Sequence, residues 1–342
     1  MRVLALETSC DETSAAVVHR DGATVTLQGL AILSQDVHRI FGGVVPELAS
    51  RAHLVTIDAV VDEALAQAGI TVDAIHGIAV TRGPGLLGAL LVGVTWARTL
   101  AWREGLPIVG VHHLEGHLFA PTLESRDAEP PFVALLVSGG HTLLVDVPAW
   151  GEYHLLGQTR DDAAGEAFDK VGSLLGLDYP AGAAVERLAA TGNPAHFVFP
   201  RPLLQREDFE FSFSGLKTAV LHAVQKSTDL AADRADIARG FQDAAIAVLA
   251  AKTARAATAC NRARVVLGGG VACNGALIRA VRAAVAPAEV CVASPRLNTD
   301  NAGMIGAAGS WRLARGERDD ASLDASDALP LPGLVVSPGA LL

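Results

Sequence analysis

The sequence lacks the features that mark secreted and membrane proteins. Its four cysteines show neither a CxxC spacing nor the density of a disulfide-stabilised domain. The longest uncharged apolar stretch, between Arg82 and Arg98, is shorter than the ~18–20 residues that a membrane-spanning helix needs, so we interpret it as a buried helix. Residues 1–7 lack the apolar core of a signal peptide and are typical of a β-strand. Together these absences predict a soluble protein of a reducing cytoplasm.

Positive charge is also scarce, since the formal net charge is −10. A protein that binds nucleic acid over its whole surface is normally basic, because phosphate neutralisation supplies most of the binding energy. Either nucleic acid is not the substrate, or a local basic cleft and partner subunits bind it. With 342 residues, half of them apolar, the chain can form a large core and is long enough for two domains.

Two segments follow the same plan. Residues 3–18 and residues 132–147 each consist of an apolar strand, a small polar turn and a second apolar strand. Each segment predicts a hairpin whose turn carries hydroxyls and backbone amides suited to an anion. They start about 130 residues apart, which is one domain length. An internal duplication is the simplest interpretation, and two unrelated hairpins are the alternative.

Further elements follow each hairpin. We expect helices over 47–69, 85–102, 162–175 and 236–261, and strands over 77–81, 265–267 and 290–293. The polar, proline-ended segment 124–131 is the expected boundary. These features predict a first lobe over 1–130, a second over 131–315, and a loosely held C-terminal tail over 316–342 that can pack back on the first lobe.

His113 and His117 lie four residues apart. On a helix their side chains would be about 40° apart, so both could bind one ion. Surface or capping histidines are the alternative, and the commoner outcome for a bare HxxxH pair. A zinc protease of the HExxH type needs a glutamate directly after the first histidine, where this chain has Leu114. Glu115 would point roughly 200° away from His113, so the protease chemistry lacks its base.

Asp300 offers a third ligand. It follows the last predicted strand and opens a helix of small residues. Two imidazoles and one carboxylate suit Fe²⁺ or Zn²⁺ and leave positions open for substrate or water. A helix N-cap is the alternative role for such an aspartate.

Three other motifs are less specific. The glycines at 268–270 let backbone approach a nucleotide, but Cys273 replaces the third glycine of GxGxxG, which disfavours a dinucleotide-binding fold. In the acidic run 161–170, Asp169 lies outside the helical Glu166–Lys170 pair and could hold ribose hydroxyls. The aromatic segment 209–217 predicts a buried strand ending in a serine cap.

Taken together, these motifs resemble the TsaD family, also known as the glycoprotease family, of the actin/hexokinase-like (ASKHA) nucleotide-binding superfamily. The matching segments span nearly the whole chain, at 7–14, 41–47, 82–85, 113–117, 138–142, 211–217 and 299–301. The resemblance implies a duplicated, two-lobed α/β fold with a nucleotide cleft between the lobes.

The family resemblance also implies an activity. Such enzymes transfer the threonylcarbamoyl group of threonylcarbamoyl-AMP to the exocyclic N6 amine of the adenosine just 3′ of the anticodon, in tRNAs that read ANN codons, and release AMP. The resemblance implies one divalent metal per chain, Fe²⁺ with Zn²⁺ as the alternative, and TsaB-like and TsaE-like protein partners. A metal-dependent glycoprotein endopeptidase, a small-molecule kinase and a non-enzymatic actin-like scaffold remain alternatives.

Carried over residue by residue, the resemblance makes His113, His117 and Asp300 the metal ligands. The implied substrate-binding residues are Leu136, Val137, Ser138, Gly139, Gly140, Asp169, Gly182 and Asn274. The candidates for proton transfer are Asp11, Glu12 and His141. The candidates for tRNA contacts are Arg201, Arg206, Arg262 and Arg264. Solvated surface arginines are the alternative for these four. The chain departs from the family at Ala181, which weakens the assignment of Gly182, and at Asn298, which leaves Asp300 untouched.

Overall fold

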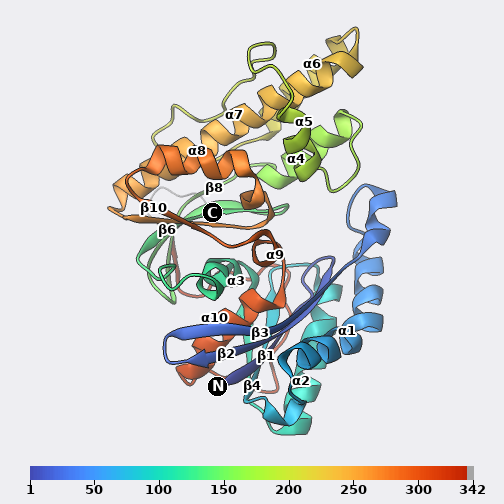
Figure 1. Cartoon of the computed structure of the whole chain (residues 1–342), viewed down its shortest axis with the longest axis vertical. Helices are drawn as coiled ribbons and strands as arrows, with labels where there is room; N and C mark the ends of the chain where they lie inside the picture. The colour runs from blue at the N-terminus through green and yellow to red at the C-terminus, as the bar shows by residue number, and fades with distance from the viewer. Residues whose placement is uncertain (337–342) are drawn as a thin grey trace. The chain divides into compact units, whose positions relative to one another are not determined.

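The computed structural model describes residues 1–336, which form two compact units. The first unit comprises residues 1–129 and 293–332, and the second comprises 130–292 and 333–336. Each unit contains one β-sheet with helices packed against it (Figure 1). Within the described residues, no helix is long and apolar enough to cross a membrane.

The sheet of the first unit has the order β3-β2-β1-β4-β5. Its strands are β1 (Arg2–Glu7), β2 (Glu12–Asp21), β3 (Thr24–Ser34), β4 (Gly77–Gly83) and β5 (Ile108–His112). The first three strands are antiparallel neighbours, whereas β4 and β5 run parallel to β1. Strand β1 is central and buried on both faces, which its continuous apolar run requires.

Helices cover both faces of this sheet. They are α1 (Pro46–Ala68), α2 (Leu87–Glu104), α3 (His113–Phe119), α9 (Pro295–Asn298) and α10 (Ala302–Ala314), with short 3₁₀ turns η1 (Asp36–Phe41), η2 (Val72–Ala74) and η3 (Ala120–Leu123). Leu4 and Leu6 share a core with α1 and α2. On the other face α10 lies so close that a Cβ at Gly309 would stand 2.3 Å from the Ala79 Cβ.

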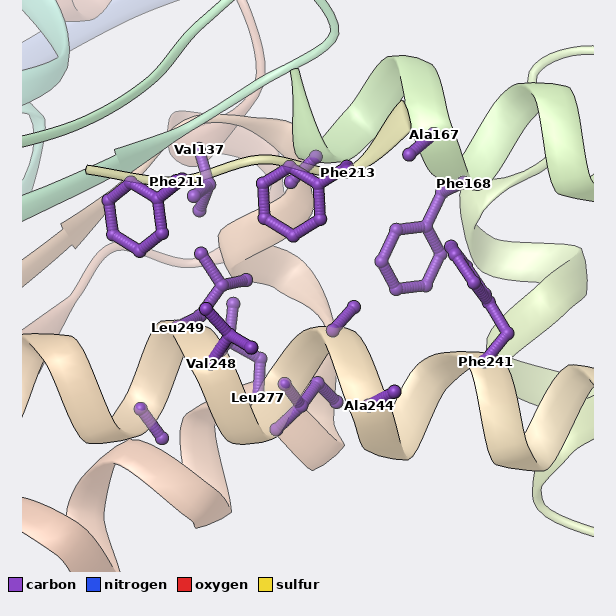
Figure 2. Packing of buried hydrophobic residues seen from close by; sticks show 14 of the residues in the cluster. Val137, Ala167, Phe168, Phe211, Phe213, Phe241, Ala244, Val248, Leu249 and Leu277 are labelled. Carbon is purple, nitrogen blue, oxygen red and sulfur yellow. The ribbon is translucent and has the colours of Figure 1, made fainter. Parts of the chain in front are cut away.

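The second unit has a sheet of order β10-β9-β6-β7-β8-β11. Its strands are β6 (Phe132–Val137), β7 (Thr142–Ala149), β8 (Glu152–Gln158), β9 (Arg264–Gly268), β10 (Glu289–Val292) and β11 (Leu334–Val336). Its helices are α4 (Ala164–Leu174), α5 (Gly182–Ala189), α6 (Ser214–Lys226), α7 (Leu230–Ala259) and α8 (Gly275–Val285), with the 3₁₀ turn η4 (Gly270–Cys273). Figure 2 shows part of its core, where the rings of Phe168 and Phe241 lie 4.9 Å apart.

The two sheets repeat one topology. In each, an antiparallel three-stranded meander (β1–β2–β3 or β6–β7–β8) carries two further parallel strands beside its first strand. The predicted hairpins are the opening pair of each sheet, with Glu7 paired to Ser14 and Val137 to Thr142. This repetition supports the internal duplication. The predicted helices correspond to α1, α2, α4 and α7, and the predicted strands to β4, β9 and β10.

The predicted division of the chain differs from the structure after the last strand of the second unit. The sequence places residues 293–315 in the second lobe, but they belong to the first unit. There the Ala302 amide donates to the Ser14 hydroxyl at 2.9 Å, and the buried Arg20 Nε donates to the Ser310 hydroxyl at 3.0 Å. The apolar face of α10 needs a sheet to cover it, and nothing in the local sequence specifies which sheet.

The predicted loose tail is packed over much of its length. Asp319 accepts a hydrogen bond from the Gly110 amide at 2.7 Å, and Leu323 is buried in the first unit. Residues 334–336 instead form β11, which pairs with β8 of the second unit. The rest of the predicted tail, 337–342, lies outside the described residues.

Candidate functional site

The local fold around α3 brings a pair of histidines against α10. Strand β5 ends at His112, whose Nδ1 accepts a hydrogen bond from the Leu114 amide at 3.2 Å and so caps the helix that starts at His113. Gly116 allows the close packing of α3 on α10, since a Cβ there would stand 2.8 Å from the Ile305 Cδ1. The face of α3 that carries His113 and His117 is thereby placed beside Asp300.

His113, His117 and Asp300 form a cluster that could hold a metal ion, with ligand atoms within 4.8 Å of one another. The Asp300 Oδ1 lies 3.5 Å from His113 Nε2 and 3.2 Å from His117 Nε2. Donor atoms bound to one ion at about 2.0–2.2 Å are expected about 3–3.5 Å apart. The three residues predicted as ligands are therefore brought together at a suitable spacing.

The burial of this cluster favours an ion over the alternatives named above. His113 is 6% exposed and His117 is 1% exposed, so neither is a surface histidine. The two buried ring nitrogens of His117 make no hydrogen bond, which is costly for an imidazole unless a ligand is bound. Asp300 is not the N-cap of α10, because Asn301 has that role and accepts from the Met304 amide at 3.1 Å.

Glu7, at the end of β1, is a residue of this site that the sequence analysis missed. Its side chain is fully buried, and its Oε2 lies 3.1 Å from His113 Nδ1. Burial by itself would raise the pKa of Glu7, but the charge and hydrogen bond of His113 outweigh it and lower that pKa. Burial likewise opposes the charge of His113, yet Asp300 and Glu7 together raise its pKa to about 9. Only the fold could reveal Glu7, because the sequence shows it as the last residue of a strand.

The proton-transfer candidates Asp11 and Glu12 lie where β1 turns into β2. Burial, followed by the negative charges of Asp300 and Asp11, raises the pKa of Glu12 to about 10. The buried His53 of α1 fixes this turn, with its Nε2 2.9 Å from the Cys10 carbonyl oxygen and its Nδ1 2.8 Å from the Thr13 hydroxyl. The third candidate, His141, belongs to the second unit, in the turn between β6 and β7.

Glu115 is turned away from the histidines, as predicted. Its carboxylate is fully buried and accepts two hydrogen bonds of 2.8 Å from the guanidinium of Arg312. It is therefore committed to an ion pair between α3 and α10.

The implied substrate-binding loop lies at the end of β6 in the second unit. Leu136 and Val137 are strand residues with buried side chains. The loop proper starts at Ser138, whose hydroxyl accepts from the His141 amide at 3.1 Å. Gly139 and Gly140 are exposed, and a Cβ at either would meet no atom within 4 Å. The loop thus offers open backbone.

Asp169 and Asn274 both act as caps of nearby helices. Asp169 accepts from the Ala181 amide at 2.7 Å, next to Gly182, the first residue of α5. Burial raises the pKa of Asp169 in spite of these backbone hydrogen bonds. Asn274 accepts from two amides at the start of α8 and donates to the buried Gln242 at 2.9 Å, a contact that the sequence did not suggest. The structure therefore gives both predicted ligands a capping role.

Comparison with known proteins decides the family. A model described as "TsaD: tRNA N6-adenosine threonylcarbamoyltransferase" matches residues 26–307. The chain belongs to this family. A tRNA N6-adenosine threonylcarbamoyltransferase of Gemmatimonas aurantiaca is 58% identical over 98% of the chain and 99% of its own length. One of Geobacter metallireducens is 55% identical over 97% of each.

Solved structures of other proteins share the fold of this TsaD family member. HypF of T. kodakarensis has a TM-score of 0.63 at 14% identity, over 92% of this chain and 48% of its own. The Acidaminococcus fermentans (R)-2-hydroxyglutaryl-CoA dehydratase component A has a TM-score of 0.52 at 14% identity, over 93% and 100%. Such low identities speak for the shared α/β architecture alone.

Most of the arginines predicted to contact tRNA are held in ion pairs. Arg262 makes two hydrogen bonds to Asp146, at 2.6 and 2.9 Å. Arg206 Nε lies 2.7 Å from Asp208, and Arg264 Nε lies 3.5 Å from Glu289. Arg201 is exposed at the surface of the second unit. Ion pairs, which the sequence did not predict, therefore engage Arg262, Arg206 and Arg264.

The aromatic segment before α6 differs from its prediction. Phe211 and Phe213 are buried, as predicted, but Phe211 makes an isolated bridge to Thr159 and the segment is no strand. No serine caps α6. The Asp161 carboxylate, which is distant in the chain, caps α6 instead. It accepts hydrogen bonds from the Phe213 amide at 2.7 Å and the Ser214 amide at 3.2 Å.

Proposed function

We propose that this chain transfers the threonylcarbamoyl group of threonylcarbamoyl-AMP to the N6 amine of the adenosine just 3′ of the anticodon, in tRNAs that read ANN codons. The observation that carries the proposal is 58% identity, over nearly the full length, to a relative that bears the name of this activity. The buried cluster of His113, His117 and Asp300 supports it, because it could hold a metal ion and consists of the three residues that the family resemblance implies as ligands.

His113, His117 and Asp300 would hold one divalent ion, Fe²⁺ with Zn²⁺ as the alternative. When bound, such an ion supplies a Lewis acid that can polarise the carbamoyl oxygen. The unbonded ring nitrogens of His117 support this assignment, since an ion would satisfy one of them.

The chain's own residues would bind and orient the substrate. The open backbone of Gly139 and Gly140 suits the phosphate of an adenylate. In the reaction the adenosine N6 forms a bond to the carbamoyl carbon, the bond from that carbon to the phosphate oxygen breaks, and AMP leaves with the electron pair. The N6 proton passes to a base, for which Asp11, Glu12 and His141 are the candidates.

TsaB-like and TsaE-like proteins are the proposed partners. An open, largely apolar groove of about 990 Å³ between α1 and α2 supports protein binding by the first unit. Leu54 and Leu91 line it and are 69% and 40% exposed. A groove lined by exposed apolar side chains can receive apolar side chains of a partner protein. The formal net charge of −10 is consistent with such partners, because a chain that is acidic overall can bind tRNA with the help of partner subunits.

The test is a transfer assay with the metal-loaded chain, threonylcarbamoyl-AMP, unmodified tRNA and the two partners. We expect threonylcarbamoyladenosine in the tRNA and AMP in equal amount. The partners are first shown to support transfer by a known member of the family. If this chain then forms no product with the same partners, the proposal is overturned. Metal-dependent cleavage of a glycoprotein, or ATP turnover with a simple metabolite, would instead favour the protease or the kinase.

A further inference from the structure

Glu7 makes an unusual set of contacts for a residue at the end of a central strand. Its Oε1 accepts from the Ser9 amide at 2.5 Å, and its Oε2 accepts from the Thr81 hydroxyl at 2.7 Å. The same Oε2 lies 3.1 Å from His113 Nδ1, and the side chain is fully buried. Fixed donors on β4 and on the turn after β1 therefore hold the carboxylate in one orientation.

This orientation determines which nitrogen of His113 faces which group. Nδ1 lies within hydrogen-bonding distance of the Glu7 carboxylate and, at 3.2 Å, of the Ser9 hydroxyl. Nε2 faces Asp300 Oδ1 at 3.5 Å. When a carboxylate accepts the Nδ1–H of a histidine, the lone pair of Nε2 is left for a metal ion, and the ring plane is fixed.

His117 provides the contrast within the same cluster. Neither of its ring nitrogens has a hydrogen-bond partner, although the residue is 1% exposed. Its Nε2 lies 3.2 Å from Asp300, another of the proposed ligands, and among the described residues no group outside the ligand set forms a hydrogen bond with its ring. Of the two histidines, His113 is the one that the protein orients before an ion arrives.

We propose that Glu7 is a positioning residue of the metal centre, which holds His113 with Nε2 directed toward the ion. Thr81 and Ser9 in turn hold Glu7. The inference rests on the proposed metal ligands, and it adds to them a residue that contacts no ion and no substrate.

The substitution Glu7→Gln tests it, because an amide can donate to Nδ1 and so permit the tautomer that carries its proton on Nε2. We expect Zn²⁺ to bind about 10- to 100-fold more weakly, the usual loss when a carboxylate behind a metal-bound histidine is changed. The affinity is measured by competition with a chromophoric chelator. Imidazole ¹⁵N chemical shifts of the Zn²⁺-loaded protein report which ring nitrogen of His113 carries a proton, and they should change in Glu7→Gln.

Glu115→Gln is the matched control, since Glu115 is equally buried and lies on α3 itself but contacts Arg312. It should lower the melting temperature and leave both the Zn²⁺ affinity and the ¹⁵N shifts of His113 unchanged. Thr81→Val keeps Glu7 and removes one of its donors, so a smaller loss of affinity is expected even if Glu7→Gln does not fold. Unchanged affinity in both Glu7→Gln and Thr81→Val, or an equal loss in Glu115→Gln, would overturn the proposal.

The outcome is separate from that of the proposed function, because the binding experiment contains neither tRNA nor threonylcarbamoyl-AMP. Failure of the unsubstituted chain to bind Zn²⁺ or Fe²⁺ would remove the metal from the proposed function. Tight binding by both the unsubstituted chain and Glu7→Gln would remove only the role of Glu7.

Discussion

Glu115 and Arg312 form a buried, two-point ion pair that joins α3 to α10. Both N···O distances are 2.8 Å, and the partners are 197 residues apart in the chain. Arg312 also donates to Glu317 at 2.6 Å, so one guanidinium connects three segments of the first unit. This pair therefore stabilises the packing of α3 on α10 within the first unit.

Arg312→Ala should destabilise the protein by about 3–5 kcal/mol, because it leaves the buried Glu115 carboxylate without its partner. Chemical denaturation measures the change. The exposed pair Arg51–Glu47 on α1 provides the control, and Arg51→Ala should cost about 0.5 kcal/mol or less. Equal losses of unfolding free energy in the two variants would show that the buried Glu115–Arg312 pair stabilises the protein no more than an exposed pair does.

Gly269 follows β9 and packs against the end of β6, so Gly269→Ala should distort the loop that follows β6. Gly269 has φ 94°, and a Cβ there would stand 2.4 Å from the Val137 carbonyl oxygen. We expect a cost of about 1–3 kcal/mol in stability and weaker AMP binding, measured by calorimetry. Gly270→Ala is the control, since nothing lies within 4 Å of a Cβ at Gly270 and its φ is not positive. Equal AMP affinity in the two variants would remove this loop from the nucleotide site.

Asp162 predicts a pH-dependent contribution to stability. Burial would raise its pKa, but hydrogen bonds from Lys217 and Lys170 outweigh burial and lower it. A carboxyl whose pKa is lower in the folded state stabilises the fold above its unfolded pKa, and this stability is lost as the pH falls through the folded pKa. The difference in unfolding free energy between the unsubstituted chain and Asp162→Asn should therefore be full at pH ~7 and shrink below pH ~4. A difference that stays constant over this range would contradict the assignment.

The groove between α1 and α2 predicts a partner-specific defect. Leu54→Asp places a charge in the groove and should weaken binding of the partner by roughly tenfold or more, while the stability of the isolated chain changes little. Trp102→Glu is the control, because Trp102 is 86% exposed on α2 but does not line the groove. Pull-down and calorimetry with each partner measure the effect. Equal weakening in both variants would point to net charge instead of the groove.

The sequence predicted most of what depends on local spacing. The succession of apolar strand, small polar turn and second apolar strand located both opening hairpins, and the four-residue spacing of His113 and His117 placed them on one helix face. Leu114 and Glu115 were enough to disfavour the protease. These features depend on neighbours in the chain, where periodicity carries the information.

What the sequence could not predict depends on pairs that are distant in the chain. Glu7 contacts His113 across 106 residues, and its own neighbours suggest only a strand. Asp161 caps α6 from more than fifty residues away, whereas the local sequence favours a serine cap. Asn274 donates to the side chain of Gln242, 32 residues away, and its own neighbours in the chain do not suggest this contact.

The most direct test of the central claim measures metal content and threonylcarbamoyl transfer on the same samples of the unsubstituted chain, His117→Ala and His76→Ala. His76 is exposed and remote from the metal ligands in sequence, so its variant controls for loss of a histidine. We predict that His117→Ala loses both the ion and the transfer of labelled threonylcarbamoyl to tRNA, while His76→Ala keeps both. Transfer that persists in His117→Ala after its metal is lost would remove the ion from the mechanism, and an ion retained by His117→Ala would contradict a metal centre that includes His117.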